Sequence, residues 1–279
     1  MPRRRGYHEH VGFNLKAIMN SYIFDDKSEE REYHRLRLVE AANDSTTIAL
    51  LVETGIRPGW HCLELGAGAG SILRWLGHRV GPGGLAVGID KNTVYLKGFD
   101  QPPFQVHEGM YPEMSMEQSF DLLHARYVLI HNRNDRAILE HMLNCLKPGG
   151  WAVFEEPDFT SATLPGREKE TPEARVNRAI CRMFDNVGLH PDYALLLPQK
   201  LEKAGFEIIR IQSIMHLCPG GSPMAQVMGE SALVLQDEYC RTGLCSPEDI
   251  QQYVRLSQDP THWTLYHSTT SAIARKSSP

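Results

Sequence analysis

The stretch Leu63-Glu64-Leu65-Gly66-Ala67-Gly68-Ala69-Gly70-Ser71 carries three glycines within five residues. Residues 62–65 predict a short buried strand before this loop, and residues 71–80 predict a helix with one apolar face after it. Glycine allows the backbone to turn tightly and to approach a ligand closely. The free N–H groups at the start of a helix then face that ligand. We therefore expect a cofactor to lie over the loop.

The spacing of the glycines distinguishes between two classes of cofactor. A dinucleotide fingerprint is Gly-x-Gly-x-x-Gly, but here the third glycine, Gly70, arrives one residue early, and Ser71 holds its expected position. Glu64 directly precedes the loop, and a carboxylate suits a cationic ligand better than a pyrophosphate. S-adenosyl-L-methionine, with its sulfonium and ammonium groups, is such a ligand. Asp90 ends the next predicted strand, where an acid can accept two hydrogen bonds from ribose hydroxyls.

Outward from the loop, predicted strands and helices alternate along the chain. The strand-like runs cover residues 62–65, 85–89, 104–107, 120–123, 151–154, 206–211 and 264–274. The helix-like runs cover residues 71–80, 135–146, 176–187, 199–204, 222–238 and 246–257. Such alternation predicts an α/β fold, a Rossmann-like, mostly parallel sheet of seven strands with helices on both faces. The last two helices form a helical cap at about 220–260, inserted before the last strand.

The N-terminal part of the chain is organised differently. Residues 1–35 are expected to form an arm or lid, and residues 36–279 the main domain with its cap. Between Glu30 and Thr54 the apolar positions fit a helix or two, with Asn43-Asp44-Ser45 offering an N-cap for a second helix. Lys147-Pro148-Gly149-Gly150 is predicted to be a turn that stops the preceding helix.

Composition excludes several classes of protein. The 279 residues are long enough for a sizeable core, and 42% of them are hydrophobic, which excludes disorder across the chain. The net charge of −5 argues against a dedicated nucleic-acid binder. No apolar run approaches the ~20 residues of a membrane span. The six cysteines include no Cys-x-x-Cys pair, which favours reduced thiols in the cytoplasm. A homodimer through the cap or the arm stays open.

With these motifs in order, the chain resembles the class I S-adenosylmethionine-dependent methyltransferases. The resemblance rests on Glu64–Gly70, on Asp90, on the Phe120–Arg126 strand and on the Leu146–Gly150 turn. It covers residues 36–160 well and the rest as architecture. Within the family, the fourth-strand region is most similar to the ubiquinone/menaquinone-like and natural-product branch.

The resemblance implies a set of cofactor-binding residues. The glycine loop would contact the methionine moiety, Asp90 with its neighbour would hold the ribose, and the end of the fourth strand would lie near the sulfonium. Met110 stands where the family often has an acid that binds the adenine amine, so a backbone group or Glu108 takes the amine, or Met110 packs on the ring. The cofactor-binding residues expected are Glu64, Gly66, Ala67, Gly68, Gly70, Asp90, Lys91, Gly109, Met110, Ala125 and Arg126.

The acceptor is expected beyond the carboxyl ends of the strands, as for ligands of open α/β sheets. His131 is the best candidate base because its unperturbed pKa is ~6.5, although a helix-flanking surface histidine is the alternative. Glu155 and Glu156 are adjacent and so point to opposite faces of a strand, and we select Glu156 as a catalytic candidate. The acceptor-binding candidates are Tyr22, Tyr127 and Asp158. Tyr22 could equally be an aromatic staple, and Asp158 a turn residue.

The expected function is transfer of a methyl group from S-adenosyl-L-methionine to O, N or C of a small molecule. We expect no metal, because the Asp, Asp-Asn arrangement of the metal-dependent methyltransferases is not recognisable. Two alternatives stay open. One is a methyltransferase acting on protein or RNA, and the other is a protein that keeps the cofactor without methylating, as a cyclising or structural module.

Overall fold

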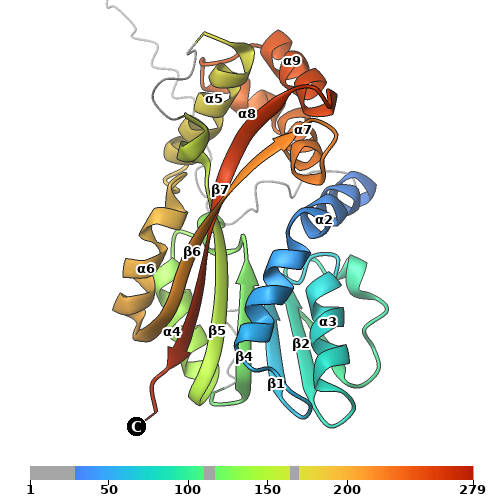
Figure 1. The fold of residues 1–279 in the computed structure, drawn as a ribbon, viewed down its shortest axis with the longest axis vertical. Coiled ribbons are helices and arrows are strands. Elements are labelled where there is room, and N and C mark those ends of the chain that lie inside the picture. The colour runs from blue at the N-terminus through green and yellow to red at the C-terminus, as the bar shows by residue number, and fades with distance from the viewer. Residues whose placement is uncertain (1–28, 110–116, 164–169, 279) are drawn as a thin grey trace, which may run out of the picture.

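The computed structural model describes residues 29–109, 117–163 and 170–278, so the predicted site residues Tyr22 and Met110 lie outside it. Its centre is one seven-stranded sheet with the strand order β3-β2-β1-β4-β5-β7-β6 (Figure 1). Strands β1 to β5 pair in parallel, and β7 is antiparallel to both β5 and β6. The strands are β1 (His61–Leu65), β2 (Leu85–Asp90), β3 (Phe104–Glu108), β4 (Phe120–Arg126), β5 (Leu146–Asp158), β6 (Phe206–Pro219) and β7 (Trp263–Lys276). The predicted sheet is confirmed.

Helices cover both faces of the sheet. On one face, α2 (Glu29–Glu53) and α3 (Ser71–Val80) bury apolar side chains against β1 and β2. On the other face, α4 (Asp135–Cys145) and α6 (Tyr193–Ala204) pack on β4, β5 and β6. Short 3-10 turns η1 (Val94–Leu96), η3 (Leu129–His131) and η4 (Phe159–Thr163) follow β2, β4 and β5. Each of these turns therefore starts at the carboxyl end of a strand.

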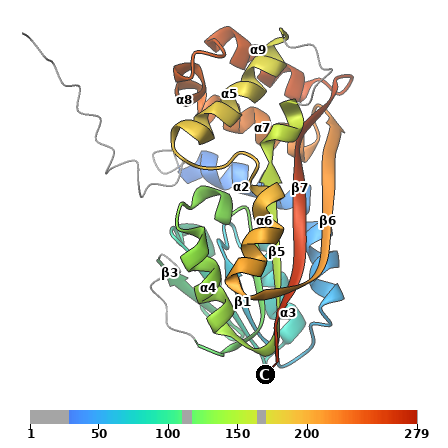
Figure 2. The same ribbon diagram turned by 90° about the vertical axis from the view of Figure 1, so that its left-hand side faces the viewer.

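A helical cap lies beyond the carboxyl ends of β4 and β5 (Figure 2). It consists of α5 (Pro172–Asn186), α7 (Pro223–Val234), α8 (Gln236–Arg241) and α9 (Pro247–Gln258). Strands β6 and β7 are each 14 residues long and carry α7, α8 and α9 between them. The prediction of one helix over 222–238 is wrong, because Leu235 leaves the helical conformation, with φ −104° and ψ 21°, and separates α7 from α8.

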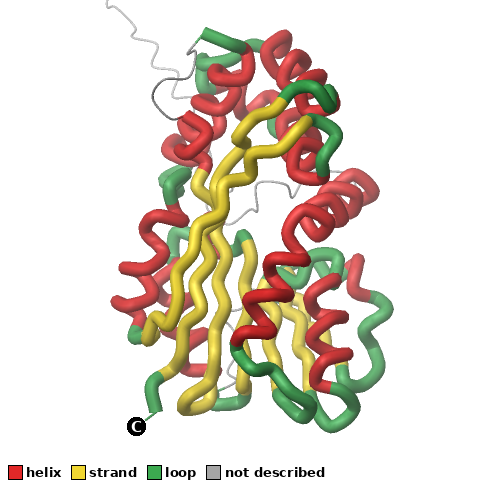
Figure 3. Tube along the Cα trace, viewed as in Figure 1, coloured by secondary structure: helices red, strands yellow, loops and turns green. Residues whose placement is uncertain are grey.

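Of the one or two helices predicted before the glycine loop, the structure has one. Helix α2 is continuous over 25 residues and runs through the expected break at 43–45 and across the expected boundary at 35/36 (Figure 3). The side chains that would have capped a second helix are used elsewhere. Asn43 donates to the carbonyl of Val39 at 2.8 Å, one turn earlier in the same helix, and Asp44 pairs with a residue of β4, as described below.

The predicted turn at 147–150 lies inside β5 rather than before it. The register shifts between Phe120, which faces Leu146, and Leu122, which faces Trp151, so the intervening residues of β5 bulge out of the ladder. Gly149 has a φ of +75°, which glycine adopts without strain. All six cysteines are free thiols, as expected. In the described part of the chain, no helix is long and apolar enough to cross a membrane.

Candidate active site

The glycine loop follows β1 and requires glycine at two of its positions. Gly66, Gly68 and Gly70 have φ values of +66°, +55° and +89°. A Cβ on Gly66 would lie 2.6 Å from the Cγ2 of Val128, and one on Gly70 would lie 2.7 Å from the ring of Phe99. Glycine at these two positions therefore allows the left-handed backbone and lets Val128 and Phe99 pack directly against the loop at the carboxyl end of β1.

Asp90 joins the end of β2 to this loop. Its Oδ2 accepts a hydrogen bond from the Gly68 N–H at 2.8 Å, and its Oδ1 accepts one from the Asn92 N–H at 2.9 Å. Burial raises the pKa of Asp90 above its ordinary value, against these backbone donors, which lower it. Each carboxylate oxygen can still accept a further hydrogen bond. The backbone N–H of Gly109 lies 3.0 Å from the carbonyl of Asp90, so the two neighbouring strand ends meet here.

The N-terminal half of α2 covers the loop. Glu40 accepts a hydrogen bond from the Ser71 N–H at 3.0 Å and so satisfies a free donor at the start of α3. The Cδ2 of Leu36 lies 3.4 Å from the position of a Cβ on Gly68. The ring of Tyr33 packs on Tyr95 of η1 with 5.3 Å between centroids. Sequence reasoning did not predict the contact of Glu40 with the glycine loop.

A buried ion-pair network lies beneath the loop. His124 of β4 stands between Glu64 of β1, at 2.7 Å from Nδ1, and Glu155 of β5, at 3.3 Å from Nε2. Burial lowers the pKa of His124, but the two carboxylates outweigh it and raise the pKa to about 9. His124 is therefore an imidazolium at neutral pH and donates to both acids. Oε2 of Glu64 is thus paired with a cation of the protein, and the predicted role of Glu64 toward a cationic cofactor stays a prediction.

Helix α2 extends the network to Arg126, the last residue of β4. Thr47 donates to Glu155 Oε2 at 2.5 Å and accepts a hydrogen bond from Arg126 Nη1 at 2.8 Å. The other guanidinium nitrogen of Arg126 forms an ion pair with Asp44 at 3.0 Å. Arg126 is thus held by two side chains one turn apart on α2, which fixes its head group at the carboxyl edge of the sheet.

Tyr127 adopts a left-handed backbone conformation, with φ +58°, which is strained for an aromatic residue. Its hydroxyl donates to Asn43 Oδ1 at 3.0 Å and lies 2.7 Å from the hydroxyl of Thr269 on β7. His216 of β6 lies 2.8 Å from the same Thr269 hydroxyl. The side chain of Tyr127 therefore joins α2, the loop after β4 and the strands that carry the cap.

Glu156 and Glu155 point to opposite faces of β5, as predicted. Both oxygens of the fully buried Glu156 carboxylate accept hydrogen bonds, from the backbone N–H groups of Val128 and Leu129 at 3.1 and 2.7 Å and of Ile130 at 3.1 Å. Burial raises the pKa of Glu156 to about 8, although these donors lower it. In this structure Glu156 positions the turn η3, and a catalytic role for it stays a prediction.

His131 ends the turn that Glu156 holds. Its ring centroid lies 6.2 Å from that of Phe184 on α5. Phe159 of η4 stacks on the Phe184 ring, with 5.3 Å between their centroids. Burial, together with the charge of Arg35, lowers the pKa of His131 to about 3. The imidazole is therefore neutral at physiological pH and is a weaker base than a free histidine, so its catalytic role stays a prediction.

Asp158 behaves as the turn residue that sequence reasoning kept as its alternative. Its Oδ1 accepts a hydrogen bond from the Thr160 N–H at 2.9 Å and so caps η4. Its Oδ2 lies 3.4 Å from the hydroxyl of Ser268 on β7. Asp158 is buried, and its acceptor-binding role stays a prediction.

The structure brings most of the predicted residues to one edge of the sheet, where β1, β2 and β4 end. These are Glu64, Gly66, Ala67, Gly68, Gly70, Asp90, Lys91, Gly109, Ala125, Arg126, Tyr127 and His131. Sequence reasoning missed the contribution of α2. The missed polar residues Glu40, Asn43, Asp44 and Thr47 recur at intervals of one helical turn, which is a signal for one polar face.

The residues of this edge fit S-adenosyl-L-methionine. The three glycines at Gly66–Gly70 carry no side chain that would keep a ligand from the loop backbone, and the carboxylate of Asp90 retains acceptor capacity for ribose hydroxyls. His124 compensates the charge of Glu64 beneath the loop. Arg126 keeps its charge compensated by Asp44, so the edge does not present an unpaired cation to a sulfonium.

Comparisons with known proteins agree with this geometry. A family model described as a methyltransferase domain matches residues 31–211, which is more than half of the chain. An uncharacterized 37.1 kDa protein in transposon TN4556 of Streptomyces fradiae is 27% identical over 70% of this chain and 57% of its own length. A sarcosine/dimethylglycine N-methyltransferase of Aphanothece halophytica is 24% identical over 74% of this chain and 70% of its own.

Solved structures share the fold. The phosphoethanolamine N-methyltransferase 2 of Haemonchus contortus, in complex with S-adenosyl-L-methionine, superposes with a TM-score of 0.53 at 17% identity, over 84% of this chain and 52% of that one. The chain spans about half the length of the first curated relatives that it matches. From the family model and the fold, the chain belongs to the class I S-adenosylmethionine-dependent methyltransferase family.

Proposed function

We propose that the protein transfers the methyl group of S-adenosyl-L-methionine to an oxygen, nitrogen or carbon atom of a small-molecule acceptor. The observation that carries the proposal is the junction at Tyr127. The Tyr127 hydroxyl, in the loop after β4, joins helix α2, which covers the glycine loop, to strand β7, which leads from the cap. Helix α7 of the cap also packs against α2. Because α2 and the cap cover the carboxyl ends of the strands from two sides, the site favours a small acceptor over a macromolecular one.

The residues of the edge have distinct roles in this proposal. Gly66, Gly68 and Asp90 bind the cofactor, which supplies a methyl group on a positively charged sulfur. Arg126 and Tyr127 are fixed by α2 and orient the groups at the acceptor side, because methyl transfer depends on close approach along one line. A base role for His131 stays a prediction, because burial lowers the pKa of its imidazole to about 3 and makes it a weak proton acceptor.

The acceptor class draws support from the names of two related proteins. The relative from Aphanothece halophytica is named for sarcosine and dimethylglycine, and the structural neighbour from Haemonchus contortus for phosphoethanolamine. These are small molecules that contain an amine. Their names support a small acceptor here, and the identity of the accepting atom is a matter for experiment.

Calorimetric titration with S-adenosyl-L-methionine, and separately with NAD, tests the cofactor half. We expect micromolar binding of the former and none of the latter. A screen of small amines, phenols and quinols then follows release of S-adenosylhomocysteine. Release with protein or RNA substrates alone would contradict the small-molecule proposal. Tight cofactor binding without release for any acceptor would favour the non-methylating alternative.

A further inference from the structure

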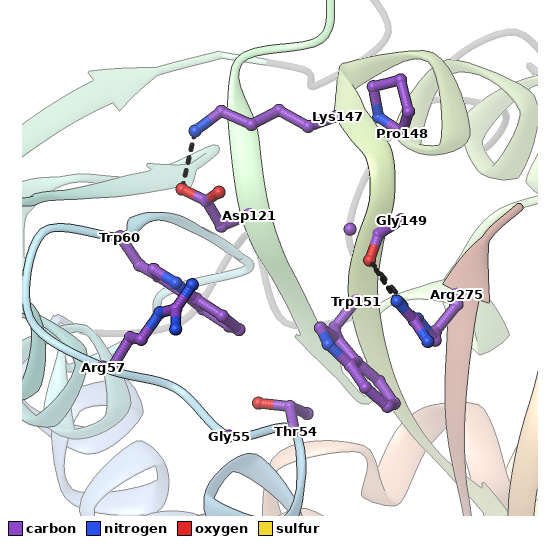
Figure 4. A pocket seen from close by; sticks show the side chains of 11 residues that line it. Thr54, Gly55, Arg57, Trp60, Asp121, Lys147, Pro148, Gly149, Trp151 and Arg275 are labelled. Carbon is purple, nitrogen blue, oxygen red and sulfur yellow. Dashed lines mark hydrogen bonds and ion pairs between the residues drawn. The ribbon is translucent and has the colours of Figure 1, made fainter. Parts of the chain in front are cut away.

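A pocket, shown in Figure 4, lies at the opposite end of the sheet from the cofactor edge. It has a volume of about 410 Å³, within the range of small-molecule sites. Its walls come from the end of α2, the turn before β1, the starts of β4 and β5, and the end of the antiparallel β7. None of the residues that form the cofactor edge lines this pocket.

Positive charge dominates the lining. Three cations, Arg57, Lys147 and Arg275, face one carboxylate, Asp121. Lys147 and Asp121 neutralise each other at 2.8 Å. Asp121 also accepts a hydrogen bond from the backbone N–H of His61 at 2.8 Å. Within the described residues, neither arginine has a carboxylate at ion-pair distance, so the pocket carries two uncompensated positive charges.

Each of these arginines lies over an indole ring. The guanidinium of Arg57 is 5.8 Å from the ring centre of Trp60, and that of Arg275 is 4.5 Å from the ring centre of Trp151. Arg275 is held further by hydrogen bonds to the carbonyl of Gly149 at 3.1 and 3.3 Å. Figure 4 shows the two arginines on opposite sides of the pocket, with Trp151 between them. The stacking orders both cations before any ligand arrives.

We propose that this pocket binds a small planar anion, an aromatic ring that carries a phosphate or a carboxylate group. Guanidinium groups match the geometry of both anions through paired N–H donors. Trp60 and Trp151 line the pocket, and the indole surface that the arginines leave uncovered is a flat apolar wall for the ring. A bare inorganic anion would leave these aromatic walls unused, and a neutral ring would leave the two charges unpaired.

Calorimetric titration of phenyl phosphate into the full chain, saturated with S-adenosylhomocysteine to occupy the cofactor edge, tests the proposal. We expect one-to-one binding, and an affinity at least tenfold higher than that of inorganic phosphate. Benzoate in place of phenyl phosphate distinguishes the carboxylate source from the phosphate source. Binding of neither aromatic anion would overturn the proposal, and so would inorganic phosphate binding as tightly as phenyl phosphate.

Variants place the binding in the pocket. We expect R57Q and R275Q each to weaken phenyl phosphate binding at least tenfold, and W151L to weaken it as well. R255Q, on the exposed face of α9 in the cap, is the matched control and is expected to bind normally. Arg57 is exposed, so R57Q stays informative if R275Q affects folding. Affinities within twofold of the unmodified chain in both R57Q and R275Q would overturn the assignment. Because the cofactor edge is separate, this test stands whether or not the proposed methyl transfer does.

Discussion

Asp90 is the residue on which the cofactor edge depends most directly. It both ties down the glycine loop through Gly68 and offers its remaining acceptor capacity to a ligand. We predict that Asp90→Ala weakens binding of S-adenosyl-L-methionine by about 1–3 kcal/mol, the value of hydrogen bonds to a charged group. Titration calorimetry measures the loss, with the exposed Lys97→Ala as control. An unchanged affinity would contradict the assigned position of the ribose.

His124 makes the stability of the protein depend on pH. Its pKa is raised to about 9 in the folded state, whereas an unfolded histidine titrates near ~6.5. The stabilisation is therefore fully present below pH ~6.5 and is lost as the pH rises through 9. Urea denaturation at pH 6 and pH 9.5 is expected to show the difference. The variant His124→Gln should be less stable at pH 6 and should lose most of this slope, so an equal slope in both proteins would count against the charged imidazole.

Local features of the fold could be predicted from the sequence, whereas the long-range contacts of helix α2 could not. The glycine loop, the parallel strands and the cap position followed from local periodicity and turn residues, since those features depend on neighbouring residues. Asn43 and Asp44 looked like helix caps because their side chains can satisfy backbone donors. Their actual partners, Tyr127 and Arg126, lie more than 80 residues away. Sequence alone gives no distance between such positions, and tertiary contacts overrode the capping preference.

The same helix offers a test of the active-site network. Thr47→Val keeps the shape of the side chain but removes the hydroxyl between Arg126 and Glu155, leaving both with one partner fewer. We predict a loss of about 1–3 kcal/mol of unfolding free energy. Turnover should fall more than cofactor affinity does. Thr46→Val, at the adjacent, less buried position, is the matched control, and equal effects of the two substitutions would contradict the network.

The helix predicted over 246–257 is present as α9, and a reciprocal pair of hydrogen bonds closes its start. The Ser246 hydroxyl accepts a hydrogen bond from the Asp249 N–H at 3.3 Å, and the Asp249 carboxylate accepts one from the Ser246 N–H at 3.0 Å. Ser246→Ala is expected to destabilise the protein by about 1 kcal/mol, because it leaves a helix donor unsatisfied. Thermal denaturation checks this against Ser45→Ala on the exposed side of α2. A variant as stable as the parent would mean that the cap contributes nothing.

At the scale of the whole molecule, the cofactor edge lies where the sheet, α2 and the cap-bearing strands meet. A ligand bound there contacts the folded state alone, so it stabilises the whole chain by mass action. At about 100 times the dissociation constant, S-adenosyl-L-methionine is expected to add about 2.7 kcal/mol, which raises the melting temperature by about 5 °C. Differential scanning fluorimetry measures the shift. NAD at the same concentration should give none, and Asp90→Ala should reduce it.

The six free thiols are distributed between the sheet and the cap. Cys62 in β1 and Cys145 at the end of α4 are buried, whereas Cys240 and Cys245 lie partly exposed in and beside α8. Burial raises the pKa of the Cys62 thiol far above its ordinary value, so this sulfur stays both protonated and inaccessible in the folded chain. An alkylating reagent is therefore expected to modify the partly exposed cap thiols before it modifies the buried thiols. The rate of labelling at Cys240 and Cys245 therefore reports local opening of the cap, and the rate at Cys62 and Cys145 reports global unfolding.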